Sequence, residues 1–419
     1  MKLGIDFGTT NSAVAVSDPR HPERGARTVE LFAGERVQRT VIYASPEGQV
    51  SFGNAAFRAY VDHDLEGRFL RSIKIFLPHD VPRTTLAGQR VSFEELVTRY
   101  LVFLRERVEE RLDAEVTSVT VGRPVRFDDD DDRDRKAVAK LTRAVHDAGI
   151  RDARLQLEPV AAAHAFEATL TEERVVLVGD FGGGTSDFAV LKVGPRRRRA
   201  PVDDRLDDVL ATSGVPMAGN VLDGCFMDTF LLDSFGRGHR ITPRYATESE
   251  PWDHPILRQI QQLYYLHLLR SDDLERRLAY VERYLDDPVP VRRLRRLVFD
   301  DLGYPMAWAI EGTKRALSEA ERATFRFDEF HSPTLNLACE VDRGRYAEGC
   351  EEVMRAYDAA IDEALRRAGL GDDGIDDVFL TGGTAQLPFL RQRFVDRFSA
   401  DRLRSADAFT SVCEGLALC

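Results

Sequence analysis

Asp6–Ser12, which reads DFGTTNS, and Asp180–Ser186, which reads DFGGGTS, are the two stretches that decide the fold. Each turn lies between two short apolar runs, and these runs are Lys2–Phe7, Ser12–Ser17, Val175–Phe181 and Asp187–Val193. Apolar runs on both sides of a glycine-containing turn are typical of β-hairpins. Because the same pattern returns after 174 residues, we expect two halves that are built alike and face one another.

The size and composition of the chain narrow its class. Its 419 residues are enough for two lobes, and 43% hydrophobic with 31% charged residues is typical of a soluble globular protein. The net charge of −12 disfavours non-specific binding to nucleic acid. The five cysteines form no C-x-x-C pair, which favours a reducing cytoplasm over a disulfide framework or a metal site. No apolar run predicts a membrane span, and the strand pattern that begins at Lys2 leaves no room for a signal peptide.

The pattern along the chain predicts an α/β protein with two similar lobes. Lobe I is expected at 1–172, with its core at 1–38 and 115–172 and an inserted subdomain at 39–114. Lobe II is expected at 173–419, with its core at 173–221 and 311–419 and a mostly helical inserted subdomain at 222–310. Within that last segment, apolar spacing predicts helices over Ile256–Leu269 and Leu274–Leu285, and Pro288 and Pro290 are expected to break the pattern.

The two glycine turns have the chemistry that a phosphate group requires. Glycine permits close approach of the backbone, and successive N–H groups in such a turn form a concavity that binds anions. The expected phosphate contacts are Gly8, Thr9, Thr10, Asn11, Gly182, Gly183, Gly184 and Thr185. For either turn alone a hairpin without a ligand remains the alternative, but the pair favours a phosphate site. No G-x-x-x-x-G-K-[ST] loop occurs, so this is not a single Walker loop.

A carboxylate precedes each turn, at Asp6 and Asp180. Carboxylates beside a triphosphate would repel it unless a divalent cation lay between them. Magnesium keeps several of its waters and takes one or two carboxylates. We therefore expect Asp6 and Asp180 to hold Mg²⁺, through its waters, with Asp187 as a candidate third carboxylate in the outer shell.

Taken together, these motifs resemble the nucleotide-binding domain of the heat-shock protein 70 kDa chaperones. The matching stretches occur in family order and extend over nearly the whole chain: Gly4–Ser12, Ser72–Lys74, Glu158–Ala163, Asp180–Asp187, Glu311–Ser318 and Leu380–Pro388. The resemblance implies the actin-like ATPase (ribonuclease H-like) fold, with a nucleotide cleft between the lobes and ATP or ADP with Mg²⁺ as cofactors. The short chain is similar to the YegD-type bacterial members, so no peptide-binding domain in the same chain is expected.

The resemblance also implies a role for each catalytic candidate. Lys74 would approach the γ-phosphate, Glu158 would orient the attacking water, and Thr185 would hold both, while Asp6 and Asp180 hold the hydrated metal. A compact ammonium suits the task of Lys74 better than a guanidinium does, and this arginine-rich chain keeps a lysine there. Without the resemblance, Lys74 could be a surface lysine, and Glu158-Pro159 could be an ordinary helix start.

A second group of residues is expected to hold the adenosine. The helix that contains Glu311, Lys314, Arg315 and Ser318 places these side chains three and four residues apart, on one face. An amphipathic helix without a ligand is the alternative for this stretch alone. The resemblance pairs the helix with Gly382, Gly383 and Gln386. Gln386 stands where the family has an arginine that stacks on adenine, and glutamine cannot supply that cation–π contact.

Four functions are compatible with these observations. The first is an ATPase whose lobes close on Mg-ATP, in a chaperone-like role, with a protein partner bound through residues 222–310. The second is a module that senses ATP or ADP with little hydrolysis. An actin-like filament protein and a small-molecule kinase share the fold and remain open, because fold alone does not settle function.

Overall fold

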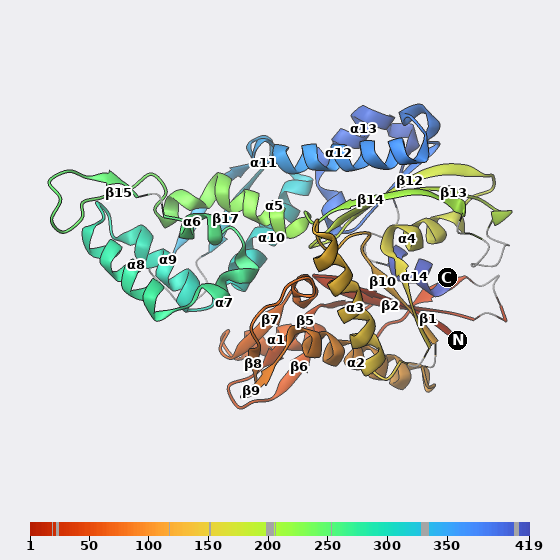
Figure 1. Cartoon of the computed structure of the whole chain (residues 1–419), viewed down its shortest axis with the longest axis horizontal. Coiled ribbons are helices and arrows are strands. Elements are labelled where there is room, and N and C mark those ends of the chain that lie inside the picture. The colour runs from red at the N-terminus through yellow and green to blue at the C-terminus, as the bar shows by residue number, and fades with distance from the viewer. Residues whose placement is uncertain are drawn as a thin grey trace. The chain divides into compact units, whose positions relative to one another are not determined.

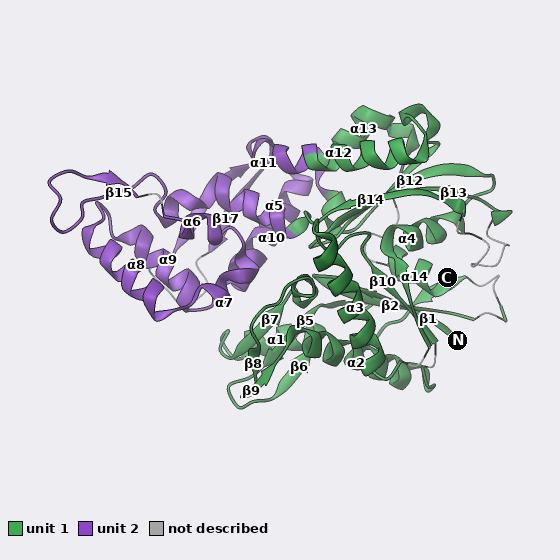
Figure 2. Ribbon diagram, viewed as in Figure 1, with its two compact units in different colours: residues 1–219, 356–386, 390–419 green, residues 220–355, 387–389 purple. Residues whose placement is uncertain are grey.

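A computed structural model describes the chain except for residues 19, 22–24, 117, 151, 198–204, 206, 253, 328–334 and 406–409 (Figure 1). The chain divides into two compact units, which are described separately below. Unit 1 comprises residues 1–219, 356–386 and 390–419, and unit 2 comprises residues 220–355 and 387–389 (Figure 2).

The first sheet of unit 1 is built on the N-terminal hairpin. Its strand order is β11-β10-β1-β2-β3, and β4 also pairs with β2. The bounds are β1 Lys2–Phe7, β2 Asn11–Ser17, β3 Ala26–Thr28, β4 Val37–Arg39, β10 Ser118–Arg123 and β11 Asp152–Leu157. Strand β1 is antiparallel to β2 and parallel to β10, which is in turn parallel to β11. The hairpin predicted around Asp6–Ser12 is thereby confirmed.

The second sheet of unit 1 repeats this arrangement. Its strand order is β14-β13-β12-β19-β20. The bounds are β12 Arg174–Phe181, β13 Ser186–Val193, β14 Val209–Val215, β19 Asp377–Thr381 and β20 Leu403–Ser405. The β12–β13 pair is antiparallel, while β19 is parallel to β12 and β20 is parallel to β19. The second hairpin is therefore confirmed, and the prediction of two halves built alike holds for the two sheets.

The helices of unit 1 follow the same repeat. In chain order, a helix precedes each of the two parallel strands that follow the hairpin, and a third helix follows the second of them. These parallel strands are β10 and β11 in the first sheet and β19 and β20 in the second. For the first sheet these are α2 Phe93–Leu112, α3 Asp131–Asp147 and α4 Glu158–Glu167. For the second sheet they are α12 Glu351–Ala368, α13 Pro388–Phe398 and α14 Ser411–Leu418. Helices α4 and α14 share an apolar core that includes Val160, Phe166, Leu416 and strand residues such as Val176 and Phe379.

A small insertion in unit 1 carries the predicted lysine. It contains β5 Val41–Ala44, β6 Val50–Phe52, α1 Gly53–Asp62, β7 Arg68–Arg71, the 3₁₀ helix η2 Ile73–Phe76, β8 Thr84–Leu86 and β9 Gln89–Val91. Helix α2 starts with a capping box, in which Ser92 and Glu95 exchange hydrogen bonds. The rings of Phe76 and Phe93 lie 4.0 Å apart, so η2 packs on the start of this helix.

Unit 2 is mostly helical, with two small β-hairpins. Its elements are α5 Gly219–Phe226, η5 Met227–Leu231, η6 Leu232–Phe235, β15 Arg240–Ile241, β16 Glu250–Pro251, α6 Ile256–Gln259, η7 Leu263–Tyr265, α7 Leu266–Leu269, α8 Asp272–Tyr284, α9 Val289–Phe299, α10 Gly303–Glu319, β17 Arg322–Phe327, β18 Leu337–Asp342 and α11 Arg343–Gly349. This unit extends to residue 355, beyond the predicted insertion at 222–310. The lobe boundaries themselves stay a prediction.

One local prediction in unit 2 was wrong. The single helix expected over Ile256–Leu269 is instead α6, η7 and α7 in succession. The break expected at Pro288 and Pro290 is confirmed, because α8 ends at Tyr284 and α9 begins at Val289 with Pro288 as its N-cap. A proline costs no hydrogen bond in the first turn of a helix.

Candidate functional site

The two glycine turns contact one another in unit 1. A Cβ atom placed on Gly183 would lie 2.2 Å from Oγ1 of Thr10, and one placed on Gly184 would lie 2.9 Å from Oγ1 of Thr9. Real Cβ atoms do not approach other atoms so closely, so this meeting of the turns requires glycine at both positions. The second turn is closed by the N–H of Gly182, which donates to the carbonyl oxygen of Thr185 at 3.1 Å. The predicted phosphate contacts from both hairpins thus gather at one place.

Lys74 and Glu158 form a buried ion pair at this site. The Nζ atom of Lys74 lies 2.6 Å from Oε1 of Glu158, and the two residues are 4% and 7% exposed. Glu158 is the first residue of α4, and Lys74 lies on η2. This 3₁₀ helix begins directly after Ser72, whose φ of 52° is in the left-handed region. Such backbone strain is costly for a serine and clusters at functional sites. The burial of Lys74 excludes the surface-lysine alternative.

Three further carboxylates share the field of this ion pair. Burial and repulsion from Glu158 raise the pKa of Asp6 to about 7, although Lys74 opposes the shift. Burial raises the pKa of Asp180 well above its usual range, with further contributions from Glu158 and Asp6. Burial also raises the pKa of Asp187 to about 7. Asp6 and Asp180, predicted from opposite hairpins, therefore act on each other electrostatically at one site.

The charges at this site fit a bound divalent cation. Burial and mutual repulsion raise the pKa values of Asp6, Asp180 and Asp187, and a bound cation such as magnesium would stabilise their ionised forms. In the part of the chain that the structure describes, no group of three or more His, Cys, Asp or Glu side chains is arranged to ligate a metal directly. The assignment of Asp6 and Asp180 to a hydrated metal stays a prediction.

Asp187 has a structural role that the sequence did not predict. Its Oδ1 atom accepts a hydrogen bond of 2.7 Å from the backbone N–H of Val125, just after β10. This bond ties the second hairpin to the first sheet. In register, Asp180 pairs with Asp187, whereas Asp6 pairs with Ala13 in the first hairpin. The sequence predicted Asp187 only as a candidate third carboxylate near the metal, and that role stays a prediction.

The predicted adenosine residues are divided between the two units. On α10 of unit 2, Lys314 pairs with Asp223 at 2.7 Å, Arg315 pairs with Glu311 at 3.1 Å, and the Ser318 hydroxyl donates to the carbonyl oxygen of Lys314. No sequence signal pointed to Asp223, which lies 91 residues before its partner.

The other adenosine candidates, Gly382, Gly383 and Gln386, lie in the turn after β19 of unit 1. Gln386 and Gly383 are exposed. The Thr384 hydroxyl in this turn donates to the carbonyl oxygen of Gly182 at 3.1 Å, which ties the turn to the second hairpin. The adenosine clamp itself stays a prediction.

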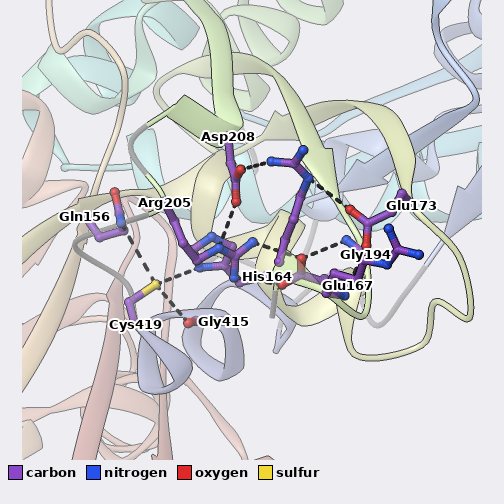
Figure 3. Close-up of polar contacts among 11 residues, drawn as sticks. Gln156, His164, Glu167, Glu173, Gly194, Arg205, Asp208, Gly415 and Cys419 are labelled. Carbon is purple, nitrogen blue, oxygen red and sulfur yellow. Dashed lines mark hydrogen bonds and ion pairs between the residues drawn. The ribbon is translucent and has the colours of Figure 1, made fainter. Parts of the chain in front are cut away.

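The far end of α4 is held by a buried ionic network (Figure 3). The Arg205 guanidinium donates to both carboxylate oxygens of Glu167, at 2.8 and 2.9 Å, and to Asp208 at 2.9 Å. Arg197 also contacts Asp208, and the backbone N–H of Gly194 donates to Glu167. Because Glu167 ends the helix that Glu158 begins, this network fixes the position of the helix that carries Glu158.

On the same helix, His164 is buried against α14. Its Nδ1 atom lies 3.1 Å from Sγ of Cys419 (Figure 3), and burial lowers the pKa of His164 from 6.5 to about 4. Between these two values the unfolded chain binds a proton that the folded chain does not. The stability that neutral His164 contributes is therefore complete above pH 6.5 and is lost as the pH falls towards 4.

We expect this loss to be visible in urea unfolding at pH 4.5 and pH 7. The wild type should lose up to about 3 kcal/mol more of its free energy of unfolding over this interval than His164→Gln does. His146→Gln is the matched control, because His146 is exposed on α3, and it should behave as the wild type. Equal pH dependence of the wild type and His164→Gln would contradict the prediction.

Comparison with known proteins decides the family. The sequence matches the Hsp70 protein family model over residues 78–241 and 305–419, which is more than half of the chain. The chain belongs to the Hsp70 family. It has the actin-like ATPase fold of that family, and the repeated sheets and helices of unit 1 agree with the fold prediction. The matched part leaves out residues 1–77 and residues 242–304, and the second of these ranges carries β16 and helices α6 to α9 of unit 2.

Two curated Hsp70 relatives match the sequence from end to end. A chaperone protein HscA homolog of Pseudoalteromonas atlantica is 25% identical over 435 residues, covering 100% of this chain and 58% of that protein. A chaperone protein DnaK of Halobacterium salinarum is 25% identical over 421 residues, covering 99% of this chain and 55% of that protein. The chain thus spans a little over half the length of these relatives. Among its described residues, no helix is long and apolar enough to cross a membrane.

Proposed function

We propose that this Hsp70-family chain binds ATP with hydrated Mg²⁺, hydrolyses it slowly, and uses the bound nucleotide to close its lobes in a chaperone-like role. The observation that carries the proposal is the buried Lys74–Glu158 ion pair beside Asp6, Asp180 and Asp187, where the two glycine turns meet. A buried cation with several carboxylates and flanking phosphate-binding turns meets the needs of phosphoryl transfer, which depends on positioning and charge neutralisation.

Each residue has a specific part in this proposal. Backbone N–H groups of the two turns bind the phosphates, and the hydroxyls of Thr9, Thr10 and Thr185 add donors. Lys74 neutralises charge that develops on the transferred phosphate, and Glu158 positions the attacking water. When bound, the metal would supply further neutralisation of the phosphate charge, with Asp6 and Asp180 orienting its waters.

Calorimetry tests the binding half of the proposal. ADP is expected to bind in the presence of magnesium and to lose at least about tenfold in affinity when magnesium is removed. Asp180→Asn should bind ADP with little dependence on magnesium, because one of the two metal-orienting carboxylates is neutral. GTP should compete poorly with ADP if the adenosine residues act as proposed. Equal ADP affinity with and without magnesium in the wild type would overturn the metal assignment.

A nucleotide-sensing module with little hydrolysis is the second candidate. Lys74 is already paired with Glu158, so a γ-phosphate would have to compete for this lysine, and Gln386 replaces the expected adenine-stacking cation. Single-turnover hydrolysis by the pure protein distinguishes the two functions: an ATPase converts one equivalent of bound ATP, and a sensor leaves it intact. Under either function, residues 222–310 are the proposed region for a protein partner.

A further inference from the structure

Two cysteines of unit 2 lie on elements that pack closely together. Helix α5 and the turn η5 contact helix α11 on both sides of Cys225. The Tyr346 hydroxyl donates to the carbonyl oxygen of Leu222 at 3.0 Å, and the Tyr346 ring meets the ring of Phe226 edge-on at 5.6 Å. One turn further along, a Cβ atom on Gly349 would lie 2.2 Å from Oγ1 of Thr229. The backbone of Gly349 therefore lies directly against the Thr229 side chain.

These contacts bring Cys225 and Cys350 side by side. Cys225 lies between Leu222 and Thr229 in sequence, and Cys350 directly follows Gly349. Each thiol shifts the pKa of the other, which places the two side chains within interaction distance. Cys225 is partly exposed, whereas Cys350 is buried. An oxidant in solution can therefore reach Cys225, and the buried Cys350 is the neighbouring thiol that can react with the oxidised Cys225.

The two thiols differ in acidity. The hydrogen bond from Cys350 lowers the pKa of Cys225, although burial and the carboxylates of Asp228 and Glu352 oppose this shift. The same hydrogen bond and burial raise the pKa of Cys350 far above its usual range. The pKa is raised by burial at Cys339, Cys413 and Cys419 as well. The thiolate is the nucleophilic form of cysteine, so the partial exposure of Cys225 and its lowered pKa favour it as the attacking thiol of the pair.

We propose that Cys225 and Cys350 form a peroxide-reactive dithiol, in which Cys225 attacks the hydroperoxide and Cys350 resolves the product to a disulfide. In the first step the Cys225 thiolate attacks one oxygen of hydrogen peroxide, the O–O bond breaks, and Cys225 sulfenic acid and hydroxide form. In the second step the sulfur of Cys350 displaces the sulfenic hydroxyl, its proton leaves with that oxygen as water, and the S–S bond forms. Overall, the two thiols lose two electrons and the peroxide gains them.

The disulfide would fasten α5 to the junction of α11 and α12. Asp223, which pairs with Lys314, lies two residues before Cys225 on α5. The link therefore forms beside the polar face of α10, although the oxidation chemistry does not depend on nucleotide binding. Dithiothreitol would reverse it, because an exchangeable thiolate can attack either sulfur.

The test uses the full chain, reduced, freed of reductant and treated with an equimolar amount of hydrogen peroxide. Free thiols are then blocked with N-ethylmaleimide, and peptides are mapped by mass spectrometry without reduction. We expect one cross-linked pair containing Cys225 and Cys350, lighter than the sum of its peptides by two hydrogen atoms and absent after dithiothreitol. A disulfide that involves Cys339 instead, or Cys225 sulfinic acid without a cross-link, would overturn the proposal.

Two single substitutions separate the roles of the thiols. In Cys350→Ser the sulfenic acid should persist on Cys225 and be trapped by dimedone, whereas in Cys225→Ser the thiol of Cys350 should stay reduced at the same peroxide concentration. Cys339→Ser is the matched control in the same unit and should form the Cys225–Cys350 disulfide like the wild type. Failure of dimedone to label Cys225 in folded Cys350→Ser, as judged by circular dichroism, would refute the assignment of the attacking thiol.

Discussion

Replacing Lys74 with methionine should reduce ATP hydrolysis at least about 100-fold, because a preorganised charge is lost from the site where negative charge develops. ADP affinity should change by no more than about threefold, since the two glycine turns and the adenosine residues remain. The measurement is single-turnover conversion of bound ATP, together with calorimetry of ADP on the same preparation. Normal turnover in Lys74→Met would refute the proposed role of this lysine.

Two controls separate chemistry from folding in this experiment. Lys74→Met leaves Glu158 buried without its partner, and removing one member of a buried ion pair can cost about 3–5 kcal/mol. The double variant Lys74→Met/Glu158→Gln removes both charges, so it should recover stability but not hydrolysis. Lys136→Met removes a lysine whose side chain is about half exposed on α3, and it should hydrolyse ATP at the wild-type rate.

Replacing Gly415 with alanine should lower the free energy of unfolding by more than about 4 kcal/mol, a loss that is exceptional for one methyl group. The added Cβ would lie 1.7 Å from the carbonyl oxygen of Ala161 and 2.4 Å from its carbonyl carbon. Neither backbone atom can move aside without separating α14 from α4, whose shared core joins the two sheets. Urea unfolding followed by circular dichroism measures the change.

Gly312→Ala is the matched control for this substitution. Gly312 is exposed on α10, and a Cβ placed there has no contact within 4 Å. Alanine in the middle of an exposed helix should stabilise the protein by about 0.5–1 kcal/mol, through the smaller entropy of the unfolded chain. A Gly415→Ala variant that unfolds at the wild-type urea concentration would show that α4 and α14 do not cross as closely as described.

Features that depend on neighbouring residues, such as the two hairpins, could be predicted from the sequence. Contacts between residues far apart in the chain could not. The two hairpins could be predicted because glycine turns between apolar runs have few alternatives, and their similarity pointed to the repeated sheets. The pairing of Lys74 with Glu158 joins residues 84 positions apart, and no local pattern contains that information. Asp223 was missed for the same reason.

The error in unit 2 has a different cause. Apolar spacing is the same for one long helix and for several short ones, so it could not reveal where η7 divides Ile256–Leu269. The boundary at Pro288 could be predicted, because proline is excluded from a helix interior and is tolerated in the first turn.

The packing of α14 also determines when this protein can finish folding on the ribosome. The N-terminal sheet depends on residues made much later: the Ser17 hydroxyl donates to the carbonyl oxygen of Ala417, 400 positions away, and Lys2 donates to the carbonyl oxygen of Cys419. A nascent chain therefore exposes one face of its first hairpin until α14 has been synthesised. Contacts between such distant positions slow folding, so synthesis of this chain creates a long interval in which that apolar face needs protection from aggregation.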